Sequence, residues 1–241
     1  MVDRGAAYAE VQARVVELVR PLSDEQLAVR VPACPAWTVR DVLAHHVGVL
    51  TDMAAGDLRD LGDPARLLDQ WRDADVARDR DALTARQVEE RRGRAVADVL
   101  AEWQQATEVL LPDWDERLAT VMGAVAVNDV VVHEGDVRQA LGLAVAPEVV
   151  ATSLALAAYS TTLALRLQQL ALPAVGFSYG GKTRTVGPGE PAATVSADRT
   201  TLVRLLASRL DEPAIRALDW VGDPTPYIPA LPEYGPAHPA P

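Results

Sequence analysis

An aspartate and a histidine lie one helical turn apart in residues 120–142, TVMGAVAVNDVVVHEGDVRQALG. At about 100° per residue, Asp129 and His133 fall on one helix face, with Asp136 close by. The same arc carries the apolar residues Met122, Val125, Val132 and Ala140. A charged group inside an apolar stripe is costly unless it is paired or bound to a cation. Because an acid and an imidazole at this spacing point at one place, the pair predicts part of a divalent metal site.

Asp129 and His133 also fit an ion pair that stabilises a helical bundle, since two ligands do not make a metal site. A third ligand could come from residues 37–48, WTVRDVLAHHVG, which contain two histidines. The apolar arc of this predicted helix runs through Val39, Leu43, Val47 and Leu50. His46 falls near the centre of the arc and His45 off its edge, so periodicity alone predicts His46 as the inward ring.

Residues 176–183, GFSYGGKT, fit the phosphate-binding pattern G-x-x-x-x-G-K-[ST]. A phosphate loop needs a helix that begins at its Lys-Thr, but here RTVGPGEP follows, and its glycines and prolines exclude a helix. The letters instead predict a β-hairpin, with strands GFSY and KTRT joined by Gly180 and Gly181 at positive φ.

The elements that must position the histidines are helical. Apolar residues recur at helical spacing over 5–20, and Thr38 with Asp41 forms a capping box that begins a second helix. Residues 22–37 read as a connector. Further helical patterns cover 83–111, 117–142 and 147–171, after an Asp- and Arg-rich stretch over 57–82. These patterns predict a mainly α fold, an up-and-down four-helix bundle over residues 1–172.

The sequence pattern changes after Pro173. Short β-prone runs alternate with Gly and Pro and end in one helical pattern, which predicts a small α+β domain over 173–241. The proline-rich tail, residues 223–241, is expected to run extended over the surface or to be disordered, and His238 within it to have no role.

Composition narrows the class of protein. With 34 acidic and 23 basic residues the net charge is −11, which would repel nucleic acid. Cys34 is the only cysteine, so no internal disulfide forms, and the N-terminus has no signal-peptide pattern. The longest uncharged run, 149–165, is too short to span a bilayer. We therefore expect a cytoplasmic protein with neither nucleic-acid nor membrane partners.

Two stretches carry a resemblance to a known family. Residues 34–48, CPAWTVRDVLAHHVG, are similar to CPGWTVRDLVAHLAG, which is typical of the mycothiol-dependent maleylpyruvate isomerase family of DinB-like metalloenzymes. Residues 128–142, NDVVVHEGDVRQALG, resemble that family's E-x-x-x-H-x-W-D-V-R-x-A-L-G signature. The resemblance implies a DinB-like four-helix bundle that holds a divalent metal, usually zinc, on His, Glu and His, followed by a small α+β domain.

Position by position, the resemblance implies that His45 and His133 are metal ligands. His45 lies eight residues after Trp37, as the family's first ligand does, whereas His46 takes a place that is usually apolar. On this point we follow the resemblance rather than periodicity. Asp129 stands where the family has its glutamate. Aspartate can bind zinc but is one methylene shorter, so the metal would lie nearer the helix or bind more weakly.

Outside the ligands, Gly135 replaces a tryptophan of the family signature, while Asp136 and Arg138 match it and are expected to be structural. Arg209 resembles a C-terminal arginine that would hold a carboxylate of substrate or cofactor, although a surface ion pair fits it equally well. Cys34 is expected to be structural as well, because the reacting thiol would come from the cofactor.

The implied chemistry is isomerisation through a thiol. The thiol of mycothiol adds to the double bond of maleylpyruvate, and rotation about the resulting single bond followed by elimination gives the trans isomer. A metal lowers the pKa of such a thiol. We therefore expect a metal- and mycothiol-dependent isomerase or transferase that acts on a small electrophile. The alternative is a non-catalytic bundle that binds a ligand or partner and whose metal site has decayed, which the changes at Asp129 and Gly135 would fit.

Overall fold

The computed structural model describes residues 2–57 and 74–235 of the chain, which divides into two compact units, Met1–Ala151 and Thr152–Pro241. The predicted fold class is confirmed, because the first unit is a helical bundle and the second is a small α+β domain. The helix α8 (Val150–Gln169), which the sequence places in a domain of residues 1–172, lies in the second unit apart from its first two residues.

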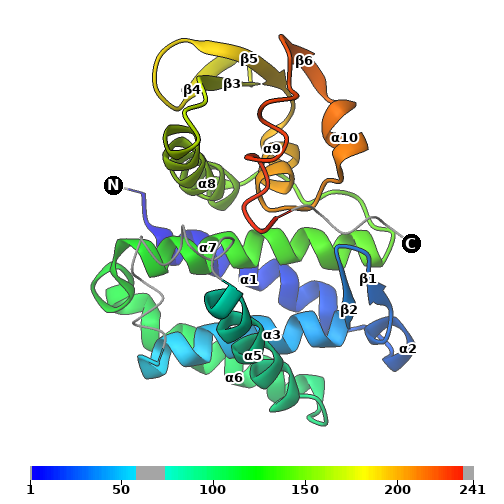
Figure 1. Ribbon diagram of the computed structural model, residues 1–241. Helices are drawn as coiled ribbons and strands as arrows, with labels where there is room; N and C mark the ends of the chain where they lie inside the picture. The colour runs from blue at the N-terminus through cyan, green and yellow to red at the C-terminus, as the bar shows by residue number, and fades with distance from the viewer. Residues whose placement is uncertain (1, 58–73, 236–241) are drawn as a thin grey trace. The chain divides into compact units, whose positions relative to one another are not determined.

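The first unit is a bundle of four helices with a fifth helix beside it (Figure 1). The bundle helices are α1 (Arg4–Val19), α3 (Val39–Ala55), α6 (Val96–Leu110) and α7 (Trp114–Ala140), and α5 (Ala74–Glu89) packs against α3. The pattern expected over 83–111 is thus two helices. Of the Asp- and Arg-rich stretch over 57–82, residues 58–73 lie outside the described residues, and the remainder from Ala74 belongs to α5.

Buried aromatic and polar side chains join α1 to α6. The ring of Trp103 is fully buried, and its Nε1 donates a hydrogen bond of 2.7 Å to the hydroxyl of Tyr8. Gln12, also buried, donates to Thr107 Oγ1 at 2.8 Å. Satisfied polar groups of this kind hold neighbouring helices in one register, because an unpaired polar atom would be costly in the core.

A short hairpin leads into α3. The expected connector contains α2 (Asp24–Leu27) and the strands β1 (Arg30–Val31) and β2 (Cys34–Thr38). The predicted capping box is present. Thr38 Oγ1 accepts from Asp41 N at 3.2 Å, and Asp41 Oδ2 accepts from Thr38 N at 2.9 Å. This cap satisfies free backbone groups at the start of the helix that carries His45 and His46.

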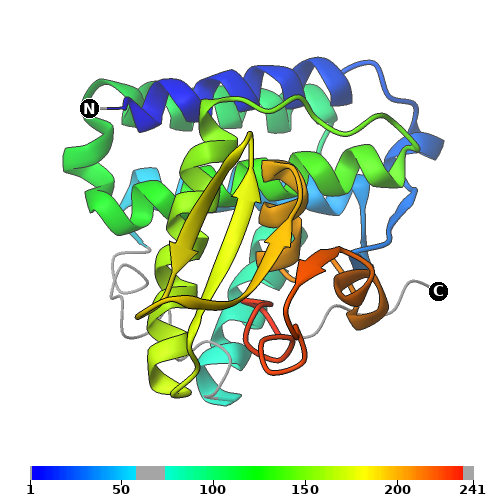
Figure 2. The same ribbon diagram turned by 90° about the horizontal axis from the view of Figure 1, so that it is seen from above.

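The second unit has a four-stranded sheet with helices α8 and α9 (Arg199–Leu206) on one face (Figures 1 and 2). Its strand order is β4-β3-β5-β6, from β4 (Lys182–Val186), β3 (Ala174–Tyr179), β5 (Pro191–Ser196) and β6 (Asp219–Val221). A short helix, α10 (Glu212–Arg216), precedes β6. The predicted hairpin is confirmed, because β3 and β4 pair antiparallel through Gly180 and Gly181 at φ 55° and 73°. GFSYGGKT is therefore not a phosphate loop.

The tail does not behave as its proline content suggests. Tyr227, Ile228 and Leu231 are buried, and the Tyr227 hydroxyl donates to the carbonyl of Ala174 at 3.0 Å. The expectation of an extended or disordered tail is therefore wrong for residues 223–235, because apolar side chains between the prolines anchor it. His238 lies outside the described residues.

One helix of the described residues, α8, is long and apolar enough to cross a membrane. Half of its most apolar stretch is buried within the protein. Length and composition alone are therefore weak support for a membrane span at α8.

We expect Thr38→Val to lower the free energy of unfolding by about 1 kcal/mol, because valine keeps the shape but removes the hydroxyl that caps α3. Thr38→Ser, which keeps the hydroxyl, is the control and should retain most of the stability. Urea unfolding of the three proteins measures this, and equal midpoints for Thr38→Val and wild type would contradict it.

A second prediction concerns Glu102 on α6. Burial raises the pKa of this carboxyl, but hydrogen bonds from Arg91, Arg94 and Thr51 lower it, and the net pKa lies below its usual value. A lowered folded-state pKa gives stability that is present above the unfolded pKa of about 4.3 and is lost as pH falls through the folded pKa. Glu102→Gln should therefore destabilise the protein most near neutral pH, and the difference from wild type should shrink in acid. Urea unfolding across pH tests this, and a difference independent of pH would refute it.

Candidate metal centre

Side chains from α3 and α7 converge inside the first unit. One nitrogen each from His45 and His133 and one oxygen of Asp129 lie within 4.8 Å of one another. Asp129 Oδ1 is 3.5 Å from His45 Nε2 and 3.5 Å from His133 Nε2. Both histidine rings are buried, and their centroids are 5.4 Å apart. The structure thus brings together the three residues that the resemblance implies as ligands.

These separations suit a bound cation better than direct hydrogen bonds. A good N–H···O bond measures about 2.7–3.2 Å, which is shorter than the 3.5 Å between Asp129 Oδ1 and each Nε2 atom. Tetrahedral zinc with bonds of about 2.0–2.1 Å places its ligand atoms about 3.3–3.4 Å apart. Two imidazoles and one carboxylate also form a known type of catalytic zinc ligand set, in which a fourth position stays open. The residues therefore fit a divalent metal.

A buried chain of hydrogen bonds orients His45. Asp52 Oδ2 accepts from Arg86 at 2.9 Å and from the amide nitrogen of Gln87 at 2.7 Å. Because a carboxylate only accepts, the Gln87 amide must turn its oxygen the other way, and this oxygen lies 2.9 Å from His45 Nδ1. Nδ1 of His45 therefore carries the proton, and Nε2 faces Asp129 as the nitrogen available to a metal.

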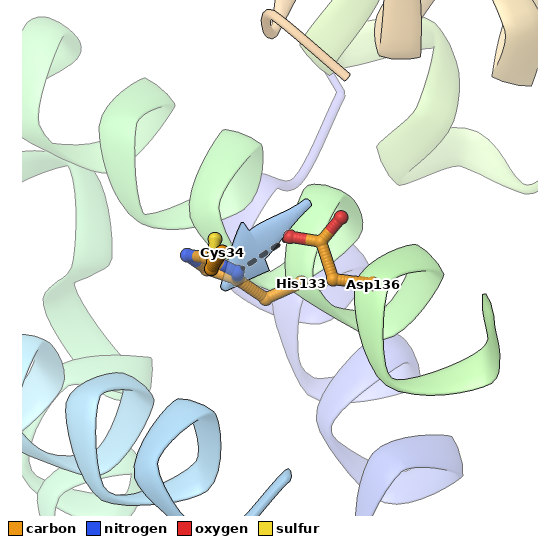
Figure 3. A group of neighbouring side chains, drawn as sticks. All are labelled: Cys34, His133 and Asp136. Carbon is orange, nitrogen blue, oxygen red and sulfur yellow. Dashed lines mark hydrogen bonds and ion pairs between the residues drawn. The ribbon is translucent and has the colours of Figure 1, made fainter. Parts of the chain in front are cut away.

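His133 is oriented in the same manner by Asp136, which is fully buried one turn further along α7. His133 Nδ1 donates to Asp136 Oδ2 at 2.8 Å, as Figure 3 shows. A carboxylate behind a ligating histidine fixes its ring and raises its basicity as a ligand. Asp136, expected to be structural, thus lies in direct contact with a candidate ligand.

Cys34 belongs to a second group of potential ligands, with His133 and Asp136 (Figure 3). It comes from β2 and its sulfur lies within 4.8 Å of a ligand atom of each. His133 Nδ1 already donates to Asp136, so a metal bound there would have to displace that hydrogen bond. We therefore take the group of His45, Asp129 and His133 as the candidate centre.

The surroundings of Asp129 stabilise the ionised form of its carboxyl. Burial raises the pKa of its carboxyl, but the nearby rings of His45, His46 and His133 lower it, and the net pKa is well below the usual value. Asp129 is therefore ionised at neutral pH, which is the form that binds a metal.

His46 is also buried next to Asp129. Its Nδ1 lies 2.9 Å from Asp129 Oδ2, and its ring stacks on Trp103 with centroids 5.4 Å apart. Periodicity therefore identified a ring that does face the core, and the resemblance identified its neighbour His45, whose Nε2 faces Asp129 Oδ1. Both are covered because α3 packs against α5, α6 and α7.

Trp37 lies beside the candidate centre and also lines a pocket. Its ring lies 4.9 Å from the ring of His45 and 6.2 Å from that of His133, measured between centroids. It also lines a cavity of about 470 Å³ between β2 and α5, together with Arg86 and Arg92. A cavity of this volume suits a small molecule.

Gln87 and Asp52 could not be identified from the sequence, because their roles depend on how α5 packs against α3, and neither stretch matches a motif. Arg209, the residue proposed for carboxylate binding, lies in the second unit, where its guanidinium donates to the carbonyl of Ala207 at 2.8 Å. Its proposed role stays a prediction.

Fold and site together define a class, the four-helix bundles with a His, acid and His set between two helices. Residues 8–138 match the family model of the mycothiol maleylpyruvate isomerase N-terminal domain, more than half of the 241 residues, and the chain belongs to this family.

Two solved structures are similar to the chain. The crystal structure of the mycothiol-dependent maleylpyruvate isomerase aligns over 86% of this chain and 88% of that one, at 12% identity and a TM-score of 0.53. A histidine-to-alanine mutant of the mycothiol-dependent maleylpyruvate isomerase aligns over the same shares at 11% identity and a TM-score of 0.53. At this identity the likeness concerns the fold. A comparison with curated proteins gives no match.

We expect Gln87→Met to weaken zinc binding by about 10–100-fold, because methionine fills the same space but cannot accept the proton of His45 Nδ1. Competition with a chromophoric chelator measures the affinity. Arg92→Met, a change in the pocket wall away from the histidines, is the matched control and should bind zinc as wild type does. Unchanged affinity in Gln87→Met would show that the orienting chain does not matter.

Proposed function

We propose that the chain is a metal- and mycothiol-dependent isomerase or transferase that acts on a small electrophile similar to maleylpyruvate. The observation that carries the proposal is the convergence of His45, His133 and Asp129, in which Asp129 Oδ1 lies 3.5 Å from each Nε2 atom, a separation that suits one cation. Membership of the mycothiol maleylpyruvate isomerase family supports the thiol as the partner.

The residues of the first unit have distinct tasks in this proposal. His45, Asp129 and His133 hold the cation, while Gln87 and Asp136 fix the two imidazoles with Nε2 inward. A bound divalent metal, most simply zinc, would supply an open position at which the pKa of a thiol falls. The ring of Trp37 lies against that of His45, with centroids 4.9 Å apart.

The small molecule would enter through the cavity of about 470 Å³ beside Trp37. Arg92 and Arg86 in its wall carry guanidinium groups that a carboxylate could approach, each of them already paired, Arg92 with Glu89 and Arg86 with Asp52. Arg209 remains a further candidate for that contact. With a net charge of −11, the protein is suited to small molecules rather than to nucleic acid, and we place it in the cytoplasm.

A second candidate is a non-catalytic bundle with a decayed metal site. The change from glutamate to Asp129, with Gly135 in place of tryptophan, favours it. The two candidates differ in one measurement, the metal content after purification without chelators. If wild type holds no metal and Asp129→Glu gains it, the decayed site is the correct interpretation.

We expect wild type to contain about one divalent metal per chain and His133→Ala to contain none, because the variant loses one of three ligands. Elemental analysis checks this. His238→Ala, a histidine in neither signature, is the control and should keep its metal. Metal retained in His133→Ala would place the ion elsewhere.

The thiol requirement can be tested separately. Wild type should join mycothiol to, or isomerise, at least one member of a panel of activated alkenes, with products identified by mass spectrometry. His133→Ala should reduce the rate at least about 100-fold, since it loses the whole metal ion and even one preorganised hydrogen-bond donor in a catalytic centre contributes about that much. A metal-loaded wild type that is inert with every thiol and electrophile would favour the non-catalytic bundle.

A further inference from the structure

The two oxygens of Asp129 have different partners. Oδ1 lies 3.5 Å from Nε2 of both His45 and His133, whereas Oδ2 lies 2.9 Å from His46 Nδ1. Since a carboxylate only accepts, His46 Nδ1 is the donor. This hydrogen bond therefore decides which oxygen of Asp129 faces the two candidate ligand rings.

His46 itself is held rigidly. Its side chain is 2% exposed, and its ring stacks on Trp103 at an interplanar angle of 20°. Its Nε2 is buried without a hydrogen-bond partner among the described residues. Leaving a polar atom unsatisfied in a core costs stability, so apolar packing alone would favour leucine or phenylalanine here. The position is usually apolar in the signature that the stretch resembles.

We propose that His46 is a positioning residue that makes Asp129 a one-oxygen metal ligand, an inference that rests on the proposed function. A free carboxylate rotates broadly about its last bond and can offer both oxygens or turn away. The hydrogen bond to Oδ2 removes that freedom and presents Oδ1 alone. His46 thereby compensates for the short reach of aspartate at a position where the signature has glutamate.

The proposal makes residues 46 and 129 a coupled pair. Glutamate at 129 would carry its carboxylate one methylene further, so the 2.9 Å hydrogen bond from His46 Nδ1 that fits aspartate would no longer fit. Asp129→Glu alone should therefore weaken binding. With His46→Leu beside it, no buried N–H donor is left without its acceptor, and the pair becomes an apolar residue at 46 with glutamate at 129, as in the signature. The two changes together should be less harmful than their separate effects predict.

The experiment measures cobalt(II) affinity and the visible spectrum of the loaded protein for wild type and three variants at position 46. His46→Leu removes the donor and should weaken binding by about 10–100-fold. His46→Asn keeps an N–H near the place of Nδ1 and should stay close to wild type. His46→Gln puts its N–H near the place of Nε2 and should resemble His46→Leu. Asparagine and glutamine both lose the stacking on Trp103, so the loss of stacking cannot explain a difference between them.

The cobalt spectrum separates positioning from packing. If Asp129 binds through both oxygens once His46 is gone, the intensity of the visible bands changes in fully loaded His46→Leu. A packing role would lower the melting temperature of the metal-free variant and leave that spectrum as in wild type. Asp129→Glu and the His46→Leu/Asp129→Glu double variant complete the set, and the double variant should bind more tightly than either single one.

The inference is overturned if wild type binds cobalt and the three position-46 variants bind it equally well or equally poorly. It is also overturned if the double variant shows the simple product of the two single effects. Either result leaves the proposed function standing. If wild type binds no divalent metal, the proposed function fails, and the role of His46 fails with it.

Discussion

The structure of the first unit depends on one constraint, the cost of placing the Asp129 carboxylate between two packed helices. Burial alone would favour the neutral acid, yet three imidazoles around it keep it ionised. Two of those rings come from adjacent positions on α3 and the third from α7. The same contact that compensates the charge therefore also fixes the register of α3 against α7.

Many features of the fold and of the candidate centre could be predicted from the sequence, because they depend on local geometry. The i, i+4 spacing of Asp129 and His133, the Thr38–Asp41 cap and the Gly180–Gly181 turn all follow from helical or hairpin geometry. Gln87 could not be predicted, because it reaches His45 only through the packing of α5 on α3 across 42 residues of chain. That Cys34 would lie near His133 could not be predicted for a similar reason, since the hairpin that carries it there reads as a connector.

The choice between His45 and His46 shows where periodicity stops being informative. A single apolar arc assumes that a helix has one covered side. Since α3 packs against three helices, both rings are buried, at 6% and 2% exposure. For the C-terminal tail, composition led to the wrong prediction. Its prolines suggested an extended chain, but Glu233 N bonds to the carbonyl of Leu206 at 2.7 Å, and Arg166 donates to that of Pro232. Composition does not show which apolar residues of such a tail become buried.

Each of the three candidate ligand side chains is hydrogen-bonded, through the atom that faces away from the centre, to a buried polar side chain. Gln87 and Asp136 are fully buried, His46 nearly so, and each bonds a different member of the His45, Asp129 and His133 set. Apolar residues at these positions would avoid the cost of desolvating three polar side chains. A bundle that had no use for a cation would gain stability by losing them. Their joint presence around one point favours a site whose ligands must be held in a defined orientation, because orientation is what such outer hydrogen bonds supply.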